Sequence, residues 1–391
     1  MKKRVAFVVQ RYGLEVNGGA ELFTRKLAEH IAHIYDIEVI TTKAVEYTTW
    51  KNEYENDTDV INGITVHRFG VVEPRDVESF SEYGNEVFDK PDVTPEKEEK
   101  WLKMQGPYSP ELIQYIEDSA DNYDVFVFVT YLYYTTVKGL PKVKDKSLFI
   151  PTAHDEAAIH LKMYEELFKM PRAIFYLTKE EKDFVEKKFN NGNIFNNGGA
   201  GGSGIDLPEN INKDRFRQER NIDEYIVYAG RIDAAKGCVQ LFEYFSRYKK
   251  ENDSSLKLVM MGKEAIDVPE SDDIISLGFV SEQDKFDIMA GAKFLVMPSE
   301  FESLSIVVLE AMALSVPVLV NGWCDVLKGH CVRSNAGLYY MSYREFEGCI
   351  NYMLKSPEVM SAMGQNGKIY VEKNYTWDVI IDRFTAMIEA V

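Results

Sequence analysis

Two glutamates bound the stretch from residue 302 to 310, which reads ESLSIVVLE and continues as AMALSVPVLV. Glu310 is the only charged residue between positions 303 and 324, so this run is typical of a protein interior. A buried carboxylate is costly unless it is paired or hydrogen-bonded. Glu310 could accept hydrogen bonds from the vicinal hydroxyls of a ribose or hexose, or form a buried ion pair with an Arg or Lys. Glu302 is a ligand-facing acid or an exposed loop acid, and the two glutamates together favour ligand binding.

Two cations follow an expected strand in the stretch AGRIDAAKGC, residues 229–238. Arg231 and Lys236 flank a short loop at the carboxyl edge of the expected sheet. They suit a diphosphate, because Arg offers a planar fork and Lys a compact charge. For either residue alone a solvated side chain is the simpler interpretation, but Gly-Arg-x-Asp and Lys-Gly after a strand form a more specific pattern.

Two further loops carry candidate residues. Gly18 and Gly19 precede an expected helix, where backbone N–H groups could approach an anion closely, although Gly-Gly at this place is usually only a turn. His154 follows a buried strand in IPTAHDE and could donate a hydrogen bond or handle a proton near neutral pH. The remaining histidines lack such a context and are interpreted as structural.

These residues must be positioned by strands that alternate with helices, a pattern that predicts parallel sheets with helices on both faces. Ligands of such sheets bind at the carboxyl ends of the strands. A buried helix is expected over residues 304–314, capped by Ser303 or Ser305. Another helix is expected to begin just after Thr178, which caps it. The strands are expected within residues 4–9, 37–42, 125–132, 147–156, 224–231, 256–262, 293–299 and 316–322, and at the start of residues 173–189, where a helix follows the strand.

Two segments interrupt the alternation. Residues 72–105 are acidic, aromatic and weakly periodic, which indicates either a solvated insertion or a lid that binds an acceptor. The glycine-rich run near residues 196–204 has the composition of a flexible loop and indicates a domain junction. The predicted domains are residues 1–200, residues 201–375, and a C-terminal helix over 376–391 that packs back on the first domain.

Composition excludes several classes of protein. The chain has 391 residues and a net charge of -18, which argues against a nucleic-acid binder; peripheral membrane association through a local basic patch stays open, and no run approaches a membrane span. The four cysteines show no C-x-x-C pairing, which favours reduced thiols in a cytoplasmic protein. Cys324, His330 and Cys331 are close in sequence but fit no zinc pattern.

The chain resembles the retaining glycosyltransferases of family 4, which have the GT-B fold of two Rossmann-like α/β domains. The resemblance rests on YAGRIDAAKG and on MPSEFESLSIVVLEAMALSVPVLV, which matches the family's two glutamates separated by seven residues. It implies a metal-independent hexosyltransferase of glycan biosynthesis, such as that of bacterial polysaccharide, that uses no cofactor. The substrates implied are a nucleoside-diphosphate sugar, with a UDP-sugar favoured and a GDP-sugar open, and a hydroxyl acceptor on a glycan, lipid-linked, protein or small molecule.

The resemblance also assigns roles to residues. It implies catalytic roles for His154, Glu302, Arg231 and Lys236. The donor diphosphate would be bound by Gly18, Gly19, Arg231, Lys236, Ile306 and Val307. The donor sugar would be bound by His154, Glu302, Leu304 and Ser305, and the nucleoside by Glu310, Phe279 and Val280. The chain differs from the family in having Ser303-Leu304-Ser305 where the family usually has Gly-Phe-Gly.

Two alternatives remain open beside the transferase. A sugar-nucleotide epimerase with the same fold would bind a similar donor. A non-catalytic binding or accessory subunit would keep the fold without turnover, and the Ser-Leu-Ser departure favours it. The sequence leaves the sugar, the base, the acceptor and the oligomeric state open.

Overall fold

The computed structural model describes residues 2–16, 18–89 and 93–391. Asn17, which precedes the Gly18-Gly19 pair, and residues 90–92 of the acidic segment lie outside the described residues. The chain forms two compact units, the first from Met1–Ser203 with Ile380–Val391 and the second from Gly204–Val379. Each unit is a mixed α/β structure around one sheet, as the alternating sequence pattern predicts.

The first unit has the strand order β3-β4-β2-β1-β5-β6-β7-β8, and every pairing of these strands is parallel except that of β3 with β4. The strands are β1 (Arg4–Val8), β2 (Asp36–Thr42), β3 (Thr58–Ile61), β4 (Ile64–Phe69), β5 (Val125–Val129), β6 (Ser147–Ile150), β7 (Ala173–Ile174) and β8 (Phe195–Asn196). The helices are α1 (Gly19–Ile31), α2 (Val77–Phe88), α3 (Pro95–Gln105), α4 (Pro110–Asp118), α5 (Tyr134–Gly139), α6 (Met163–Leu167) and α7 (Lys179–Phe189). Short 3₁₀ helices are η1 (Ala120–Asn122), η2 (Leu140–Lys142), η3 (Lys144–Lys146) and η4 (Ala157–His160).

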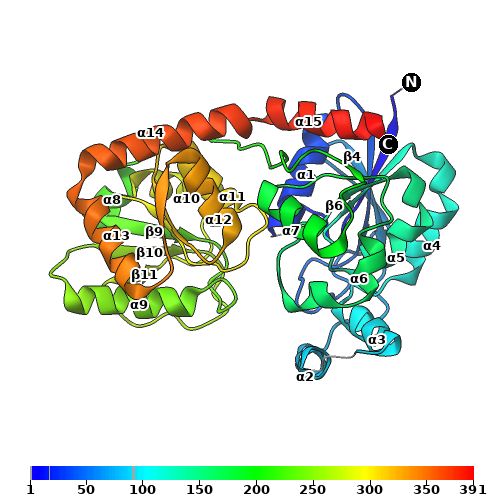
Figure 1. Cartoon of the computed structure of the whole chain (residues 1–391), viewed down its shortest axis with the longest axis horizontal. Helices are drawn as coiled ribbons and strands as arrows, with labels where there is room; N and C mark the ends of the chain where they lie inside the picture. Colours follow the sequence, from blue (N-terminus) through cyan, green and yellow to red (C-terminus); the bar gives the residue numbers. More distant parts are fainter. Residues whose placement is uncertain (1, 17, 90–92) are drawn as a thin grey trace. The chain divides into compact units, whose positions relative to one another are not determined.

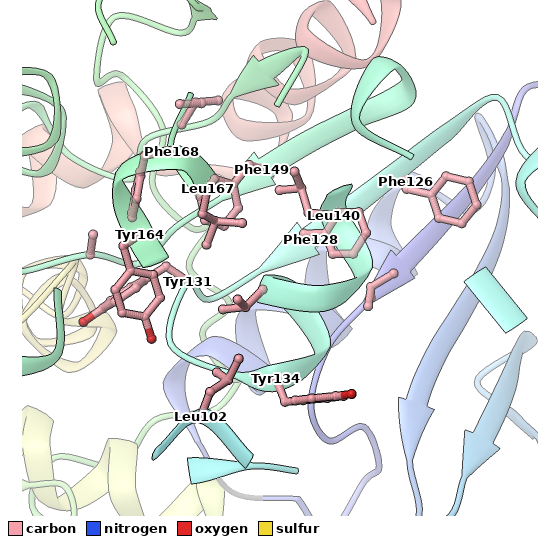
Figure 2. Close-up of a cluster of buried hydrophobic side chains, with 14 of the residues drawn as sticks. Leu102, Phe126, Phe128, Tyr131, Tyr134, Leu140, Phe149, Tyr164, Leu167 and Phe168 are labelled. Atoms are coloured by element: carbon pink, nitrogen blue, oxygen red, sulfur yellow. The ribbon is translucent and has the colours of Figure 1, made fainter. Parts of the chain in front are cut away.

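The core of the first unit gathers beside β5, whose five residues VFVFV are all buried. A run that is apolar at every position is typical of a strand covered on both faces of a parallel sheet. Phe126 and Phe128 point to one face, where they join a large cluster with Phe149 and Leu140 (Figure 2). This buried strand lies between β1 and β6, and the loops that carry Gly18 and His154 follow those two strands.

The acidic segment over residues 72–105 is not a purely solvated insertion. It forms α2 and α3, which lie side by side (Figure 1). Asp76 caps α2 and Thr94 caps α3, each accepting a hydrogen bond from a backbone N–H in the first turn. Trp101 and Leu102 of α3 are buried in the core, so α3 has one apolar face despite its many charged residues.

The second unit has the strand order β11-β10-β9-β12-β13-β14, and all of these pairings are parallel. The strands are β9 (Tyr225–Ala229), β10 (Lys257–Met261), β11 (Ile274–Ser276), β12 (Leu295–Met297), β13 (Val318–Asn321) and β14 (Gly337–Tyr340). The helices are α8 (Arg215–Arg220), α9 (Cys238–Glu251), α10 (Glu282–Gly291), α11 (Ile306–Ala313), α12 (Asp325–Ser334), α13 (Tyr343–Lys355) and α14 (Pro357–Asn374). The last helix, α15 (Trp377–Ala390), begins in the second unit and ends in the first.

The glycine-rich run before residue 204 is held by specific contacts, whereas its composition predicts a flexible loop. The side chain of Asn197 bonds to both the backbone N–H and the carbonyl of Tyr176, at 3.0 and 2.8 Å. The carbonyl of Gly201 accepts a hydrogen bond from Arg383 of α15 at 3.2 Å. A side chain at Gly201 would collide with the Tyr176 carbonyl, so glycine here serves close packing.

Candidate functional site

The strand order of the second unit reverses between β9 and β12. From β9 the chain proceeds to β10 and β11 on one side, then returns to β12 and continues to β13 and β14 on the other. Connections diverge at such a point and leave a crevice at the carboxyl ends of the two strands, where open α/β sheets bind ligands. The loop after β9 carries Arg231 and Lys236, and the loop after β12 carries Glu302.

Lys236 and Glu302 meet directly at this crevice. The Lys236 Nζ lies 2.8 Å from the Glu302 Oε1, and the ammonium side chain is more exposed than the carboxylate. Gly237 permits the approach of the two loops, because it has a φ of +75° and a Cβ would lie 2.5 Å from the Pro298 carbonyl. The structure therefore brings together two residues whose predicted ligands are the two adjoining parts of a nucleotide sugar.

Arg231 is oriented by its own loop. Its Nε is ion-paired with the Asp233 carboxylate, and Asp233 also accepts the backbone N–H of Lys236 at 2.7 Å. Asp233 thus couples the two cations and explains the acid in the Gly-Arg-x-Asp pattern. The sequence alone does not show this coupling.

The loop before α11 differs from the sequence-based expectation. The helix begins at Ile306 rather than residue 304, and the Ser305 side chain makes no capping hydrogen bond, so the predicted capping by Ser305 is wrong. Ser305 instead has a φ of +63°, in the left-handed region that favours glycine. Ser305 thus adopts a backbone conformation that glycine would adopt without steric cost, while Leu304 before it is buried.

Glu310 is not a lone buried acid. Its Oε1 lies 2.7 Å from the Nζ of Lys285 on α10, which is the ion pair that the sequence left as an alternative. Burial nevertheless raises the pKa of Glu310, with the Lys285 charge acting against it. The second oxygen, Oε2, is buried and has no hydrogen-bond partner among the described residues. Such an unsatisfied buried acceptor is unusual in a protein interior.

Phe279 and Val280 lie in the loop between β11 and α10. Phe279 is 74% exposed, and Val280 is half-buried. The preceding Gly278 accepts a hydrogen bond through its carbonyl from Gly262 at 2.8 Å, which ties this loop to the end of β10. An exposed aromatic ring at the sheet edge fits a stacking contact with a base.

The Gly18-Gly19 turn begins α1 in the first unit. Gly18 lies at the N-cap position, and a Cβ there would lie 2.1 Å from the Glu21 carboxylate. Glu21 is buried with Arg11, whose Nη2 lies 2.6 Å from its Oε1. This buried ion pair packs beneath the turn and was missed in the sequence, where Arg11 carries no local signal.

His154 lies on the loop after β6 in the first unit. Its Nε2 is 3.8 Å from the Glu156 Oε1, and the side chain is partly exposed. The buried Glu181 of α7 accepts the backbone N–H of Ala153 at 2.6 Å and that of Leu177 at 2.7 Å. Glu181 therefore holds the loop that carries His154. The sequence signalled this acid only as part of the helix start, where Thr178 caps α7 as predicted.

The Cys324–Cys331 segment shows no metal site. In residues 2–16, 18–89 and 93–391, no group of three His, Cys, Asp or Glu side chains could hold a metal ion. The cysteines are free. His330 Nε2 lies 2.9 Å from the Leu304 carbonyl, and its Nδ1 lies 3.2 Å from the Tyr370 hydroxyl. Among the described helices, none is both long and apolar enough to cross a membrane.

Comparison with known proteins finds a family model and a curated relative that match part of the chain. Residues 210–370 match the family model described as glycosyl transferases group 1. A curated relative from Xenopus tropicalis, glycosyltransferase 1 domain-containing protein 1, is 25% identical over 176 residues, which cover 42% of this chain and 49% of the relative. The matched part of the chain thus spans about half the length of this relative.

Solved structures resemble the whole chain in fold. A sucrose-phosphate synthase from Thermosynechococcus elongatus has a TM-score of 0.73 at 14% identity, covering 99% of this chain and 98% of that one. Anabaena Alr3699/HepE, solved in complex with UDP and glucose, has a TM-score of 0.70 at 13% identity, covering 100% of both chains. WaaG, a glycosyltransferase of lipopolysaccharide biosynthesis, has a TM-score of 0.64 at 14% identity over 99% of each. The predicted GT-B fold is confirmed.

Proposed function

We propose that this chain is a retaining hexosyltransferase that moves a sugar from a nucleoside-diphosphate sugar to a hydroxyl acceptor, a proposal supported by the match of residues 210–370 to the glycosyl transferases group 1 model. A UDP-sugar is the favoured donor, since the similar Anabaena HepE was solved with UDP and glucose and with UDP-glucose. The acceptor is a hydroxyl of a glycan, lipid-linked, protein or small molecule.

The observation that carries this proposal is the 2.8 Å contact between Lys236 and Glu302 at the reversal of strand order between β9 and β12. Each residue neutralises the charge of the other in this contact. A diphosphate oxygen can replace the carboxylate as the partner of Lys236, which frees Glu302 to accept sugar hydroxyls. The pair therefore accounts for both an anionic and a hydroxyl-bearing part of one ligand.

The proposed chemistry needs positive charge where the leaving group forms. The bond between the sugar C1 and the diphosphate oxygen breaks, the acceptor oxygen bonds to C1 on the same face, and the acceptor proton passes to the departing diphosphate. Negative charge grows on the diphosphate during this step. Arg231, Lys236 and the N-terminus of α11 would stabilise it, so we propose catalysis without a divalent metal or cofactor.

The nucleoside would bind beside Glu310. Its unpaired Oε2 can accept a ribose hydroxyl, while Lys285 holds the other oxygen. The exposed ring of Phe279 offers a face to the base. The roles of His154, Gly18 and Gly19, which belong to the first unit, stay predictions from the resemblance.

Nucleotide binding is tested by thermal shift with UDP, GDP and their sugars, because a ligand of the native state raises its stability by mass action. Lys236→Ala should weaken nucleotide binding roughly tenfold or more, as a charge-assisted contact is lost. Lys293→Ala is the matched control. It breaks the Lys293–Glu224 pair of 2.7 Å, which flanks the start rather than the end of β12. Equal effects of the two variants would contradict the proposed site.

Turnover is tested with a labelled nucleotide sugar and a panel of hydroxyl acceptors, before and after dialysis against EDTA. Glu302→Gln should lower transfer about a hundredfold while the nucleotide still binds. A rate that EDTA abolishes and Mg²⁺ restores would contradict metal-independent catalysis. An epimerised free nucleotide sugar would instead indicate an epimerase, and nucleotide binding without any turnover would indicate an accessory subunit.

A further inference from the structure

Trp323 differs from the other tryptophans of the chain in its exposure. All four tryptophans belong to the described residues. Trp50, Trp101 and Trp377 are at most 9% exposed, whereas Trp323 is 63% exposed. An indole left in solvent forgoes the large apolar contribution that tryptophan makes in a core, so its position calls for a reason.

The exposed indole is held in one orientation. Its Nε1–H donates to the Met341 carbonyl at 3.2 Å, and the backbone N–H of Trp323 donates to the Asn321 side chain at 3.0 Å. Asn321 is buried and donates in turn to the Pro298 carbonyl at 2.9 Å. A ring that is fixed by its edge can bind a ligand on its face with little loss of conformational freedom.

Trp323 stands beside the proposed sugar site. It follows β13, which is the neighbour of β12, so its loop and that of Glu302 leave adjacent parallel strands at the same sheet edge. The next residue, Cys324, is buried, and burial raises the pKa of its thiol to about 11. The hydrogen bond of 2.9 Å from Asn321 to the Pro298 carbonyl joins the end of β13 to the loop after β12, which carries Glu302.

A purely structural role does not account for the indole. Trp323 precedes Cys324, the N-cap residue of α12, and an apolar residue in that place often packs on the fourth helical residue. Here that residue is Lys328, whose Nζ lies over the Tyr339 ring at 5.1 Å from its centroid. The indole remains mostly in solvent, so helix capping leaves its face unused.

We propose that Trp323 is a stacking platform for a pyranose ring bound next to Glu302, an inference that rests on the proposed function. The C–H groups on a pyranose face are apolar and weakly positive, which complements the negative face of an indole. Hydroxyls at the rim of the same ring could reach the Glu302 carboxylate or the Lys236 ammonium. The donor sugar and an acceptor sugar present the same chemistry.

Intrinsic fluorescence of the whole chain tests this platform, because Trp323 is the tryptophan that a soluble quencher reaches. Acrylamide quenching is measured with UDP alone, with UDP-sugars, and with methyl glycosides of glucose, galactose and mannose in the presence and absence of UDP. We expect a sugar-bearing ligand to protect the indole beyond the effect of UDP. Protection by the UDP-sugar assigns the ring to the donor, and protection only by a glycoside assigns it to the acceptor.

Affinity measurements with variants provide the second readout. Trp323→Ala should weaken binding of the protecting sugar about fivefold and leave the Kd for UDP unchanged. Trp323→Phe keeps an aromatic face and should retain most of the affinity. Tyr352→Ala is the matched control, because it removes another exposed aromatic side chain from the same unit, on α13.

The outcomes separate the two proposals. If no sugar-bearing ligand protects the indole and Trp323→Ala binds sugars as the wild type does, the platform is overturned while UDP binding, and the proposed function, stand. If the wild type binds no nucleotide, both are overturned. A Trp323→Ala variant that changes only the oligomeric state assigns the indole to an interface between copies and also overturns the platform.

Discussion

Lys236 pairs with Glu302 in the loop before α11, and Lys285 pairs with Glu310 in α11 itself. The two pairs differ in burial. The Lys236 side chain is more exposed than that of Lys285, and Glu310 is more buried than Glu302. A partly exposed ion pair is worth about 0–1 kcal/mol, so a ligand can replace one partner at low cost. A buried charge, by contrast, must keep its partner. The first pair is therefore suited to exchange with a ligand and the second to permanent support.

The Lys285–Glu310 pair can be tested by a double-mutant cycle. Lys285→Met should lower the free energy of unfolding by about 3 kcal/mol, because it leaves the buried Glu310 charge uncompensated. Glu310→Gln should cost less, since Lys285 retains access to water. The double variant should recover most of the loss, and urea unfolding of the four proteins measures this. Additive losses would show that the two side chains do not depend on each other.

His330 supports the same loop from beneath. It is fully buried and contacts the Leu304 carbonyl at 2.9 Å. Burial, aided by the Arg333 charge, lowers the pKa of His330 to about 4. The neighbouring Tyr370 and Tyr375 rings present hydroxyls that bond to each other. The imidazole is therefore neutral at pH 7, and its contact with Leu304 requires the proton on Nε2.

This depressed pKa predicts an acid-sensitive stability. Below about pH 6.5 the unfolded chain binds a proton at His330, while the folded chain binds one only near pH 4, so stability falls as the pH drops through this window. The loss should reach about 3 kcal/mol near pH 4. His330→Gln cannot titrate but can still donate to Leu304. The stability advantage of the wild type over this variant should shrink between pH 7 and pH 4, and a constant difference would contradict the prediction.

At the scale of elements, α7 holds in place the segments that follow two strands. Glu181 in its first turn accepts N–H groups from the segments that follow β6 and β7. Glu181→Ala would leave these buried donors unpaired and should cost about 2–4 kcal/mol in unfolding free energy. Asp183→Ala on the same helix removes only an exposed i,i+4 pair with Lys179 and should change stability by less than about 0.5 kcal/mol. Comparable losses of unfolding free energy in both variants would contradict this role of Glu181.

Sequence patterns predicted the elements that depend on local chemistry. The buried run VFVFV identified β5, and the spacing of Thr178 and Glu181 identified the start of α7. The pattern failed over residues 72–105, because α2 and α3 bury only a narrow face and Trp101 is surrounded by charged residues. The paired edge strands β3 and β4 were also not predicted, since their partners are set by the sheet.

The candidate site shows the same division between local and distant information. Glu302, Lys236 and Arg231 were predicted because each lies in a motif at a strand end. Lys285 and Glu181 were missed as partners, since Lys285 is 25 residues from Glu310 in sequence and only the sheet topology brings α10 to α11. The positive φ of Ser305 was likewise invisible, because serine rarely adopts it.

At the scale of the whole molecule, the chain crosses between its two units twice. It leaves the first unit after Ser203 and returns with Ile380, so the end of α15 belongs to the first unit. There the Phe384 ring contacts Phe7 and Phe175, with centroid distances of 6.1 and 5.2 Å. The first unit is therefore completed by residues that follow the whole second unit in the sequence.

This connectivity predicts which unit responds to which change in calorimetry. Phe384→Ala should cost about 3–5 kcal/mol, since it opens a cavity in the first unit. Phe346→Ala is the matched change in the second unit, where the fully buried ring packs against Tyr340. If the units unfold as separate transitions, Phe384→Ala should lower one and Phe346→Ala the other, and UDP should raise the transition that Phe346→Ala lowers. A single transition that both variants lower equally would show instead that the units unfold as one.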